Sequence, residues 1–314
     1  MRNFPLALAV AGSLIVPFAS SVSASEPALR AVVLGIAQDG GVPHIGCEQE
    51  LCVSARRDSA RRQRVASLGL VDERAGARFV IDATPDLASQ LDSLNEGRVL
   101  KDRRKPVDGI LLTHAHIGHY TGLMYLGREA LGASGVPVYA TPRMGRFLRE
   151  NGPWSQLVSL GNIVLREIEP GRKFALTPDL EVTALVVPHR DEFSDTVGYL
   201  VRSPSGSLLY LPDIDKWEKW GRAIEDVVAQ VDAAFLDATF FSLEELPGRS
   251  QGEVPHPLVG ETMQRLARLA PRVRFLHVNH TNRLLFDAVA QREVESRGFR
   301  VAHDGDVLPL APAP

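Results

Sequence analysis

The sequence has no surplus of basic residues. Its formal net charge is −3, with 35 Lys and Arg against 38 Asp and Glu. Binding to nucleic acid by bulk electrostatics needs a basic surface. We therefore exclude a protein that tracks along DNA or RNA. A few arginines around a cleft could still hold one phosphate, because a whole-chain charge does not reveal them.

Three common catalytic and cofactor motifs are missing as well. No Gly-x-Ser-x-Gly turn is present, so a serine hydrolase of the α/β type lacks its nucleophile. Gly35 and the pair Gly40-Gly41 do not form the Gly-x-Gly-x-x-Gly phosphate cradle, and there is no P-loop. These absences disfavour serine hydrolysis and a dinucleotide cofactor.

The sequence favours an exported protein without a stable membrane anchor. Residues 1–24 resemble a signal peptide, with Arg2, an apolar stretch over residues 4–18 and a small-residue cleavage site at Val22-Ser23-Ala24. An uncleaved anchor is the alternative, but the stretch is shorter than the roughly 20 apolar residues of a spanning helix. We predict a mature domain over residues 25–314, located in the periplasm or secreted. The sequence leaves the oligomeric state open.

Cysteine is scarce, and four residues separate the two that occur. Cys47 and Cys52 would meet an oxidising compartment after export, which favours a local disulfide. They could instead be half of a structural zinc site completed by His44 or another group. Two free buried thiols are the third alternative.

What the sequence does contain is the pattern of a layered α/β domain. Apolar residues make up 45% of the chain, enough for one buried core. Short β-branched runs alternate with helical stretches between residues 30 and 310. We predict strands at residues 31–37, 78–83, 109–113, 136–140, 180–187, 197–202, 208–211, 233–236 and 273–278. We predict helices at residues 85–94, with Pro85 first, and at 143–151, 217–228, 257–269 and 287–297. The polar residues that follow apolar runs are Asp82, His114, His189, Asp213, Asp237 and His280.

Three histidines follow one of these apolar runs within six residues. His114 and His116 share a face of the extended chain because strand side chains alternate with period two. His119 can return to the same space once the chain turns after Gly118. Neutral imidazole is a favoured zinc ligand, and catalytic zinc sites use three protein ligands with an open position. The cluster therefore predicts a catalytic metal site.

The order of the remaining polar residues resembles a known ligand pattern. In the metallo-β-lactamase superfamily, a His-x-His-x-Asp-His segment is followed by a lone His, an Asp and a final His. The likeness is closest to the pyrroloquinoline quinone biosynthesis protein B group and covers nearly all of the mature chain. The matching segments are Val33-Leu34-Gly35, Cys47 to Cys52, Ile81-Asp82-Ala83-Thr84-Pro85-Asp86-Leu87, Thr113 to Leu123, Asp195-Thr196-Val197-Gly198-Tyr199, Asn279-His280-Thr281-Asn282 and Val301-Ala302-His303-Asp304-Gly305.

The resemblance implies a four-layer αββα sandwich and a two-metal centre. By its pattern, one metal, Zn²⁺ with iron or manganese as alternatives, would be held by three histidines, a second by two, and an aspartate would bridge them. Gly118 stands where the family has the aspartate of the second site, so we expect that site to be weak or empty unless Asp39, Asp215 or another carboxylate substitutes. The predicted ligands are His114, His116 and His189 for the first metal, His119 and His280 for the second, and Asp213 between them.

Two residues are candidates for catalysis beyond metal binding. Zinc lowers the pKa of its bound water to about 7, and Asp213 is placed to orient that water or accept its proton. Val254-Pro255-His256-Pro257 resembles the late histidine motif of the phosphodiesterase-like branches, so His256 would donate a proton to the leaving group. Its alternative role is to cap the following helix. Further candidates for the cleft are Asp39, His44, Arg190 and His303.

We therefore predict a metal-dependent hydrolase that attacks an ester-like bond of a small-molecule substrate, with a phosphodiester favoured over a lactone or a β-lactam. One alternative is an enzyme of the quinone-cofactor pathway that uses iron for oxidation. The export signal counts against it, since that pathway is expected in the cytoplasm. Another alternative is a binding protein that has lost catalysis, which the glycine at position 118 keeps open.

Overall fold

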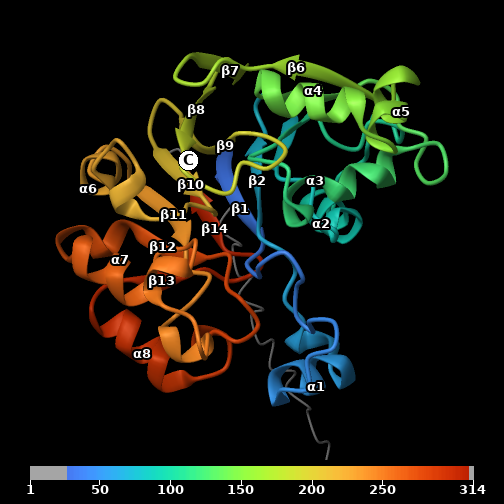
Figure 1. Cartoon of the computed structure of the whole chain (residues 1–314). Coiled ribbons are helices and arrows are strands. Elements are labelled where there is room, and N and C mark those ends of the chain that lie inside the picture. The colour runs from blue at the N-terminus through green and yellow to red at the C-terminus, as the bar shows by residue number, and fades with distance from the viewer. Residues whose placement is uncertain (1–26, 311–314) are drawn as a thin grey trace, which may run out of the picture.

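The protein forms two stacked β-sheets covered by helices on both outer faces. The computed structural model describes residues 27–310, and Figure 1 shows the two sheets at the centre of this part of the chain. The predicted signal peptide, residues 1–24, and the last four residues lie outside the described range. None of the described helices combines the length and apolar character needed to cross a bilayer.

The first sheet comes from the N-terminal half of the chain and the last strand. Four consecutive strands, from β3 to β6, are parallel, and β1 and β2 pair antiparallel at one side. In spatial order the strands are β14 (Val307–Pro309), β1 (Leu29–Gly35), β2 (Ser67–Asp72), β3 (Ala77–Ile81), β4 (Gly109–Leu111), β5 (Val136–Ala140) and β6 (Ile163–Glu167).

The second sheet comes from the C-terminal half and has a matching design. Its four strands from β10 to β13 are parallel, and β7, β8 and β9 form an antiparallel meander at the other side. In spatial order the strands are β13 (Arg300–Val301), β12 (Val273–Leu276), β11 (Ala233–Asp237), β10 (Ser207–Leu211), β9 (Thr196–Arg202), β8 (Leu180–Val187) and β7 (Lys173–Thr177).

The alternation of side chains along the strands creates three apolar layers. In β10, Leu208 and Tyr210 face the layer between the sheets, whereas Leu209 and Leu211 face the helices outside. This is the period-two geometry of a strand buried on both faces. The resulting αββα order confirms the predicted four-layer sandwich.

The helices cover the outer faces of the sheets. Those on the first sheet are α2 (Leu87–Leu94), α3 (Ile117–Tyr120), α4 (Pro142–Glu150) and α5 (Trp154–Ser159). Those on the second sheet are α6 (Ile224–Val228), α7 (Val259–Arg265) and α8 (Ala288–Ser296). Helix α1 (Glu50–Arg57) follows the long loop after β1.

Some sequence predictions of the elements were wrong. The strands β2, β6, β7, β13 and β14 were missed. The predicted helix 217–228 is broken near Gly221 into a 3-10 turn, Trp217–Lys219, and α6. Pro85 is not the first residue of a helix, because Thr84 accepts the N–H of Asp86 in a turn and α2 begins at Leu87.

Candidate metal centre

The fold brings the ends of six strands to one edge of the sandwich. Strands β1, β3 and β4 of the first sheet and β8, β10 and β12 of the second run in the same sense within their sheets and each leads into a polar residue. Carboxyl ends of strands are where α/β proteins collect functional side chains. The residues supplied in this way are Asp39, Asp82, His114, His189, Asp213 and His277.

The first group of potential ligands comes from the histidine cluster and the loop after β8. Ligand atoms of His114, His116 and His189 all lie within 4.8 Å of one another. Nε2 of His114 lies 2.9 Å from Nδ1 of His116, on the extended chain between β4 and α3. The structure thus brings together the three histidines predicted for the first metal.

The second group of potential ligands lies beside the first. It combines one residue of the histidine cluster with two residues from distant parts of the chain. Ligand atoms of Asp39, His119 and His277 also lie within 4.8 Å of one another. His119 projects from α3, whereas Asp39 follows β1 and His277 follows β12. Three separate parts of the chain therefore build this half of the centre.

Asp213 lies between the two groups. Its Oδ2 atom is 2.9 Å from Nε2 of His119 and 3.2 Å from Nε2 of His277. The same oxygen is 3.7 Å from Nε2 of His114, and Oδ1 is 3.5 Å from Nε2 of His189. One carboxylate thus faces ligands of both groups, as a bridging ligand would.

Six buried polar atoms at this centre have no hydrogen-bond partner among the described residues. Buried polar groups are normally paired, so a concentration of unpaired ones in one place needs an explanation. A divalent cation accounts for this set, because imidazole nitrogen and carboxylate oxygen are zinc ligands. The unpaired atoms at the centre are Oδ1 of Asp39, Nε2 of His119, both ring nitrogens of His189, Oδ2 of Asp213 and Nε2 of His277.

Outer hydrogen bonds hold the ligands of the first sheet in place. Oδ2 of Asp82 lies 2.8 Å from Nδ1 of His119, which leaves Nε2 to face the centre. Oδ1 of Asp82 accepts the backbone and hydroxyl protons of Thr113, whose Oγ1 is 3.0 Å from Nδ1 of His114. Such carboxylate-histidine contacts fix the ring orientation of metal ligands.

The second sheet repeats this arrangement with Asp237 and Thr239. Oδ1 of Asp237 accepts the hydroxyl proton of Thr239, and that hydroxyl lies 3.0 Å from Nδ1 of His277. Asp82 and His277 are the non-glycine residues with positive φ in the described chain, at 71° and 59°. Backbone strain of this kind gathers at functional sites, and here both instances orient metal-facing groups.

The electrostatics divide the histidines into two states. Burial lowers the pKa of His189 to about 4 and holds the pKa of His114 well below its usual value, so both are neutral at pH 7. Burial opposes a charge on His119 too, but the Asp82 carboxylate, with Asp213 and Asp39, raises its pKa well above the usual value. The raised pKa means that the carboxylates favour a proton on His119. A metal cation bound among the same carboxylates would balance their negative charge in place of that proton.

His256 also reaches the centre. Its Nδ1 atom lies 2.8 Å from Oδ2 of Asp237 and 3.6 Å from Oδ1 of Asp213, and the residue is buried. Burial opposes a charge on His256, but the carboxylate of Asp237, together with those of Asp213 and Asp39, raises the pKa of His256 above its usual value. The side chain does not cap α7, which begins at Val259, so the alternative role of a helix cap does not fit this geometry.

The structure corrects the last predicted ligand. His280 belongs to none of the ligand groups in residues 27–310; its ring stacks on His44, with 4.1 Å between centroids. His277 takes its place because it directly follows β12, at the edge where the other ligands lie, whereas His280 is three residues further along. The sequence signal that could have identified His277 is its position immediately after the apolar run of β12.

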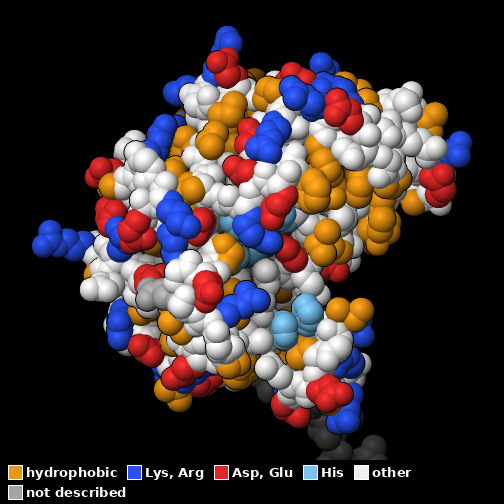
Figure 2. All heavy atoms as spheres, in the orientation of Figure 1, with side chains coloured by type: hydrophobic (Ala, Val, Ile, Leu, Met, Phe, Trp, Pro, Cys, Tyr) orange, Lys and Arg blue, Asp and Glu red, His pale blue; other side chains and the backbone are white. Residues whose placement is uncertain are grey.

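The other second-rank candidates fall into different places. Arg190 pairs with Glu192, whose Oε2 lies 3.0 Å from Nε2 of His116 at the rim. His303 is exposed and lies 3.8 Å from Asp306, away from the ligand groups. Figure 2 shows histidine side chains in a hollow of the visible face with charged side chains around it.

Cys47 lies in the loop that leads into α1, and Cys52 lies within the first turn of that helix. Both thiols are free and buried, so the structure contains no disulfide between them. Of the three alternatives, it agrees with two free buried thiols. Cys52 accepts a hydrogen bond from the backbone N–H of His44, and the neighbouring Cys47 thiol and burial both raise its pKa. No ligand group among the described residues includes these thiols.

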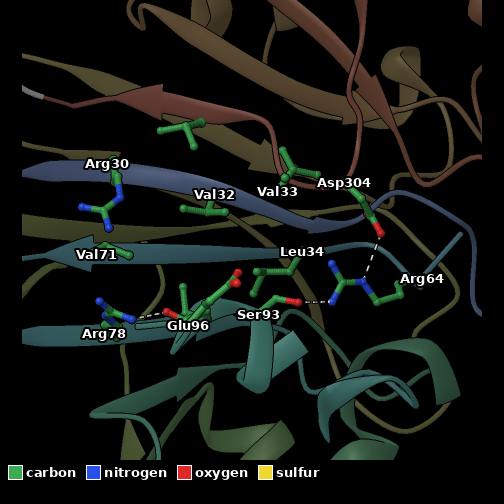
Figure 3. A pocket seen from close by; sticks show the side chains of 13 residues that line it. Arg30, Val32, Val33, Leu34, Arg64, Val71, Arg78, Ser93, Glu96 and Asp304 are labelled. Carbon is green, nitrogen blue, oxygen red and sulfur yellow. Dashed lines mark hydrogen bonds and ion pairs between the residues drawn. The ribbon is translucent and has the colours of Figure 1, made fainter. Parts of the chain in front are cut away.

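A separate cavity of about 480 Å³ lies on the outer side of the first sheet (Figure 3). Its arginines are engaged by protein groups. Arg64 donates to Asp304 at 3.0 Å and to Ser93 at 2.8 Å, and both Arg30 and Arg78 pair with Glu73. These contacts tie β1, β2 and β3 to the segments around them.

Comparison with known proteins agrees with this geometry. The profile of the family described as "Beta-lactamase superfamily domain" matches residues 77–277, which is more than half of the chain. The chain belongs to the beta-lactamase superfamily. The match begins at β3 and ends at His277, so it spans most of the candidate centre but excludes Asp39.

Relatives in this superfamily are similar along almost the whole chain. The "Coenzyme PQQ synthesis protein B" of Methylobacterium sp. (strain 4-46) is 28% identical over 312 residues, covering 90% of this chain and all of the relative. The crystal structure of Zn²⁺-bound PqqB from Methylobacterium extorquens superposes with a TM-score of 0.76 at 24% identity, covering 90% of this chain and all of that one. A diphosphatase of the PhnP family gives a TM-score of 0.66 at 24% identity, covering 89% and 96% of the two chains. These structures establish the metallo-β-lactamase fold.

Proposed function

We propose that the protein is a zinc-dependent hydrolase that attacks an ester-like bond, with a phosphodiester as the favoured substrate. The observation that carries this proposal is the pair of ligand groups that share Asp213 and hold unpaired buried ligand atoms. Paired metal sites of this kind clamp the attacking and leaving oxygens of a displacement. The Zn²⁺-bound relative supports zinc as the metal.

The residues of the chain have distinct roles in such a reaction. A bound zinc ion lowers the pKa of water to about 7 and polarises the bond under attack. Asp213 faces both ligand groups and orients the attacking water. His256 donates a proton to the leaving group, and Asp237 holds its Nδ1 at 2.8 Å so that Nε2 remains for that transfer.

The substrate class can be separated with three chromogenic compounds. We expect the zinc-loaded protein to hydrolyse bis-p-nitrophenyl phosphate faster than a chromogenic lactone or a chromogenic cephalosporin. Treatment with a chelator should abolish turnover, and added zinc should restore it. Turnover that survives complete metal removal would contradict the proposal. Faster hydrolysis of the lactone would contradict the phosphodiester as the favoured substrate.

A second candidate function has the stronger support from the comparisons. Relatives named for coenzyme PQQ synthesis match this chain over their full length, which favours a metal-dependent step in making a quinone cofactor. Iron held by the three histidines of the first group would suit an oxidation. A strain lacking its own protein B gene tests this directly: restored production of the coenzyme by this chain, and loss of it with His116→Ala, would favour this candidate over hydrolysis.

A non-catalytic binding role is less well supported by the geometry. The basis for this role was the glycine at position 118, but the ligand groups of the described centre contain two carboxylates and six histidines. Metal binding without turnover in the substrate panel and without complementation would favour it.

Export is part of the proposal, because residues 1–24 have the sequence of a signal peptide. N-terminal sequencing of protein recovered from the periplasm or medium tests the cleavage after Ala24. Protein found only in the cytoplasm with an intact N-terminus would contradict export and remove the objection to the cofactor-synthesis candidate.

A further inference from the structure

The space beside Gly118 is already occupied. Gly118 is buried in α3, and a Cβ atom built on it would lie 2.1 Å from Oδ1 of Asp39 and 2.8 Å from its Cα. Real Cβ atoms essentially never approach other heavy atoms closer than 3.0 Å. A side chain at position 118 and Asp39 in its present position therefore exclude each other.

The loop that carries Asp39 is fixed next to His277 by backbone hydrogen bonds. The N–H of Gln38 donates to the carbonyl of Val278 at 3.0 Å, and the N–H of Val278 donates to the carbonyl of Ile36 at 2.8 Å. These bonds join the residue before Asp39 to the residue after His277. The position of Asp39 is thus set by pairing between the segment that follows β1 and the segment that follows β12.

A tight turn completes this support. The N–H of Gly41 donates to the carbonyl of Gln38 at 2.8 Å, and Gly41 has φ of 64°, a conformation that glycine adopts without a steric penalty. A Cβ atom at Gly40 would lie 2.5 Å from the His44 ring, so the His44 side chain packs closely on this turn. The Asp39-Gly40-Gly41 sequence therefore presents a carboxylate from a closely packed turn.

The carboxylate points at the second ligand group. Oδ1 of Asp39 lies 3.3 Å from Nε2 of His119 and 3.6 Å from Nε2 of His277. This oxygen is buried and has no hydrogen-bond partner among the described residues. It offers the charge and the donor atom that the superfamily pattern would otherwise place at position 118.

We propose that Asp39 is the carboxylate ligand of the second metal site and replaces the aspartate missing at position 118. The proposal rests on the proposed metal dependence and specifies how the second site is completed. It revises the expectation, based on Gly118 alone, that this site is weak. The ligands of the second metal are then Asp39, His119 and His277, with Asp213 shared.

Metal stoichiometry after equilibrium dialysis against zinc tests the assignment without an activity assay. We expect two zinc ions per chain in the wild type and one in Asp39→Gly. Asp215→Asn is the matched control, because Asp215 is two residues from Asp213 but pairs with Lys219 and should keep both ions.

Asp39→Asn keeps the shape of the side chain and guards against a folding defect. We expect its second zinc to be at least about 10-fold weaker in competition with a chromogenic chelator, because the amide loses the ligand's charge. Wild-type stoichiometry and affinity in both Asp39 variants would overturn this inference while leaving metal dependence intact. A wild type that takes up no zinc would instead overturn the proposed function and this inference together.

Discussion

The metal centre, at the edge shared by both sheets, and the arginine-lined cavity on the first sheet are two polar regions that differ in how their polar atoms are satisfied. In the cavity of Figure 3, Arg64 donates to the carboxylate of Asp304. Arg78 pairs with the carboxylate of Glu73, which the figure does not draw. At the centre, buried ligand atoms such as Oδ2 of Asp213 and Nε2 of His277 lack such bonds. A buried polar group without a partner costs stability, so a protein keeps several together only where something else binds them. The comparison therefore assigns stability to the cavity and chemistry to the centre.

The largest expected effect is on activity when a ligand of the centre is removed. His116→Ala should reduce metal-dependent activity to background, because loss of a group that merely orients a ligand already costs about 10- to 100-fold. Its side chain is only partly buried, so the free energy of unfolding should change by less than about 1 kcal/mol. Metal analysis and thermal melting measure the two effects, and wild-type turnover would sink the ligand assignment.

His256→Gln should separate catalysis from metal binding. Because His256 is assigned to proton transfer, kcat should fall by about 100- to 10,000-fold while both metals remain bound. Steady-state kinetics with an activated leaving group provides a further check, since a leaving group that needs no proton should recover much of the rate. Equal losses for activated and unactivated substrates would argue against the proton-donor role.

Asp82→Asn should weaken metal binding without removing a ligand. Asp82 fixes Nδ1 of His119, so its loss should lower zinc affinity at the second site by about 10- to 100-fold. Chelator competition measures this change. Asp108→Asn is the control, because that carboxylate accepts a backbone N–H of Arg78 far from the ligand groups and should leave affinity unchanged.

Arg64→Ala should have the smallest effect of these variants. In contrast to the changes at the metal centre, it should lower stability and leave activity unchanged. It removes the partly buried ion pair with Asp304 and should lower the free energy of unfolding by about 1 kcal/mol. Metal content and kcat should stay at wild-type values. If this variant lost metal or activity as His116→Ala does, the division between the two regions would fail.

Local sequence was enough to find the histidine cluster of residues 114–119, which supplies ligands to both groups. His114, His116 and His119 are neighbours in the chain, and the extended segment followed by α3 places them together. The partners of His119 in the second group were not accessible in this way. His277 and Asp39 are brought together by pairing between residues 37 and 278, which are far apart in sequence.

The same distinction explains why strand β6 was missed. Predicted strands such as β4, β10 and β12 are buried apolar runs with a clear local signal. The missed strand β6 is mostly exposed, with residues that carry no regular apolar alternation, and it becomes a strand because it pairs with β5 at the end of the sheet. Pairing partners, which sequence periodicity does not report, determine such edges.

The sequence by itself therefore determined the α/β class and the histidine cluster His114, His116 and His119, because both depend on periodicity and on residues close together in the chain. It also showed that position 118 lacks a carboxylate. Only the tertiary structure decided that His277 rather than His280 faces the centre and that Asp39 fills the space beside Gly118. The physical reason is that these positions depend on which strand ends meet at one edge, and that is fixed by the packing of two sheets.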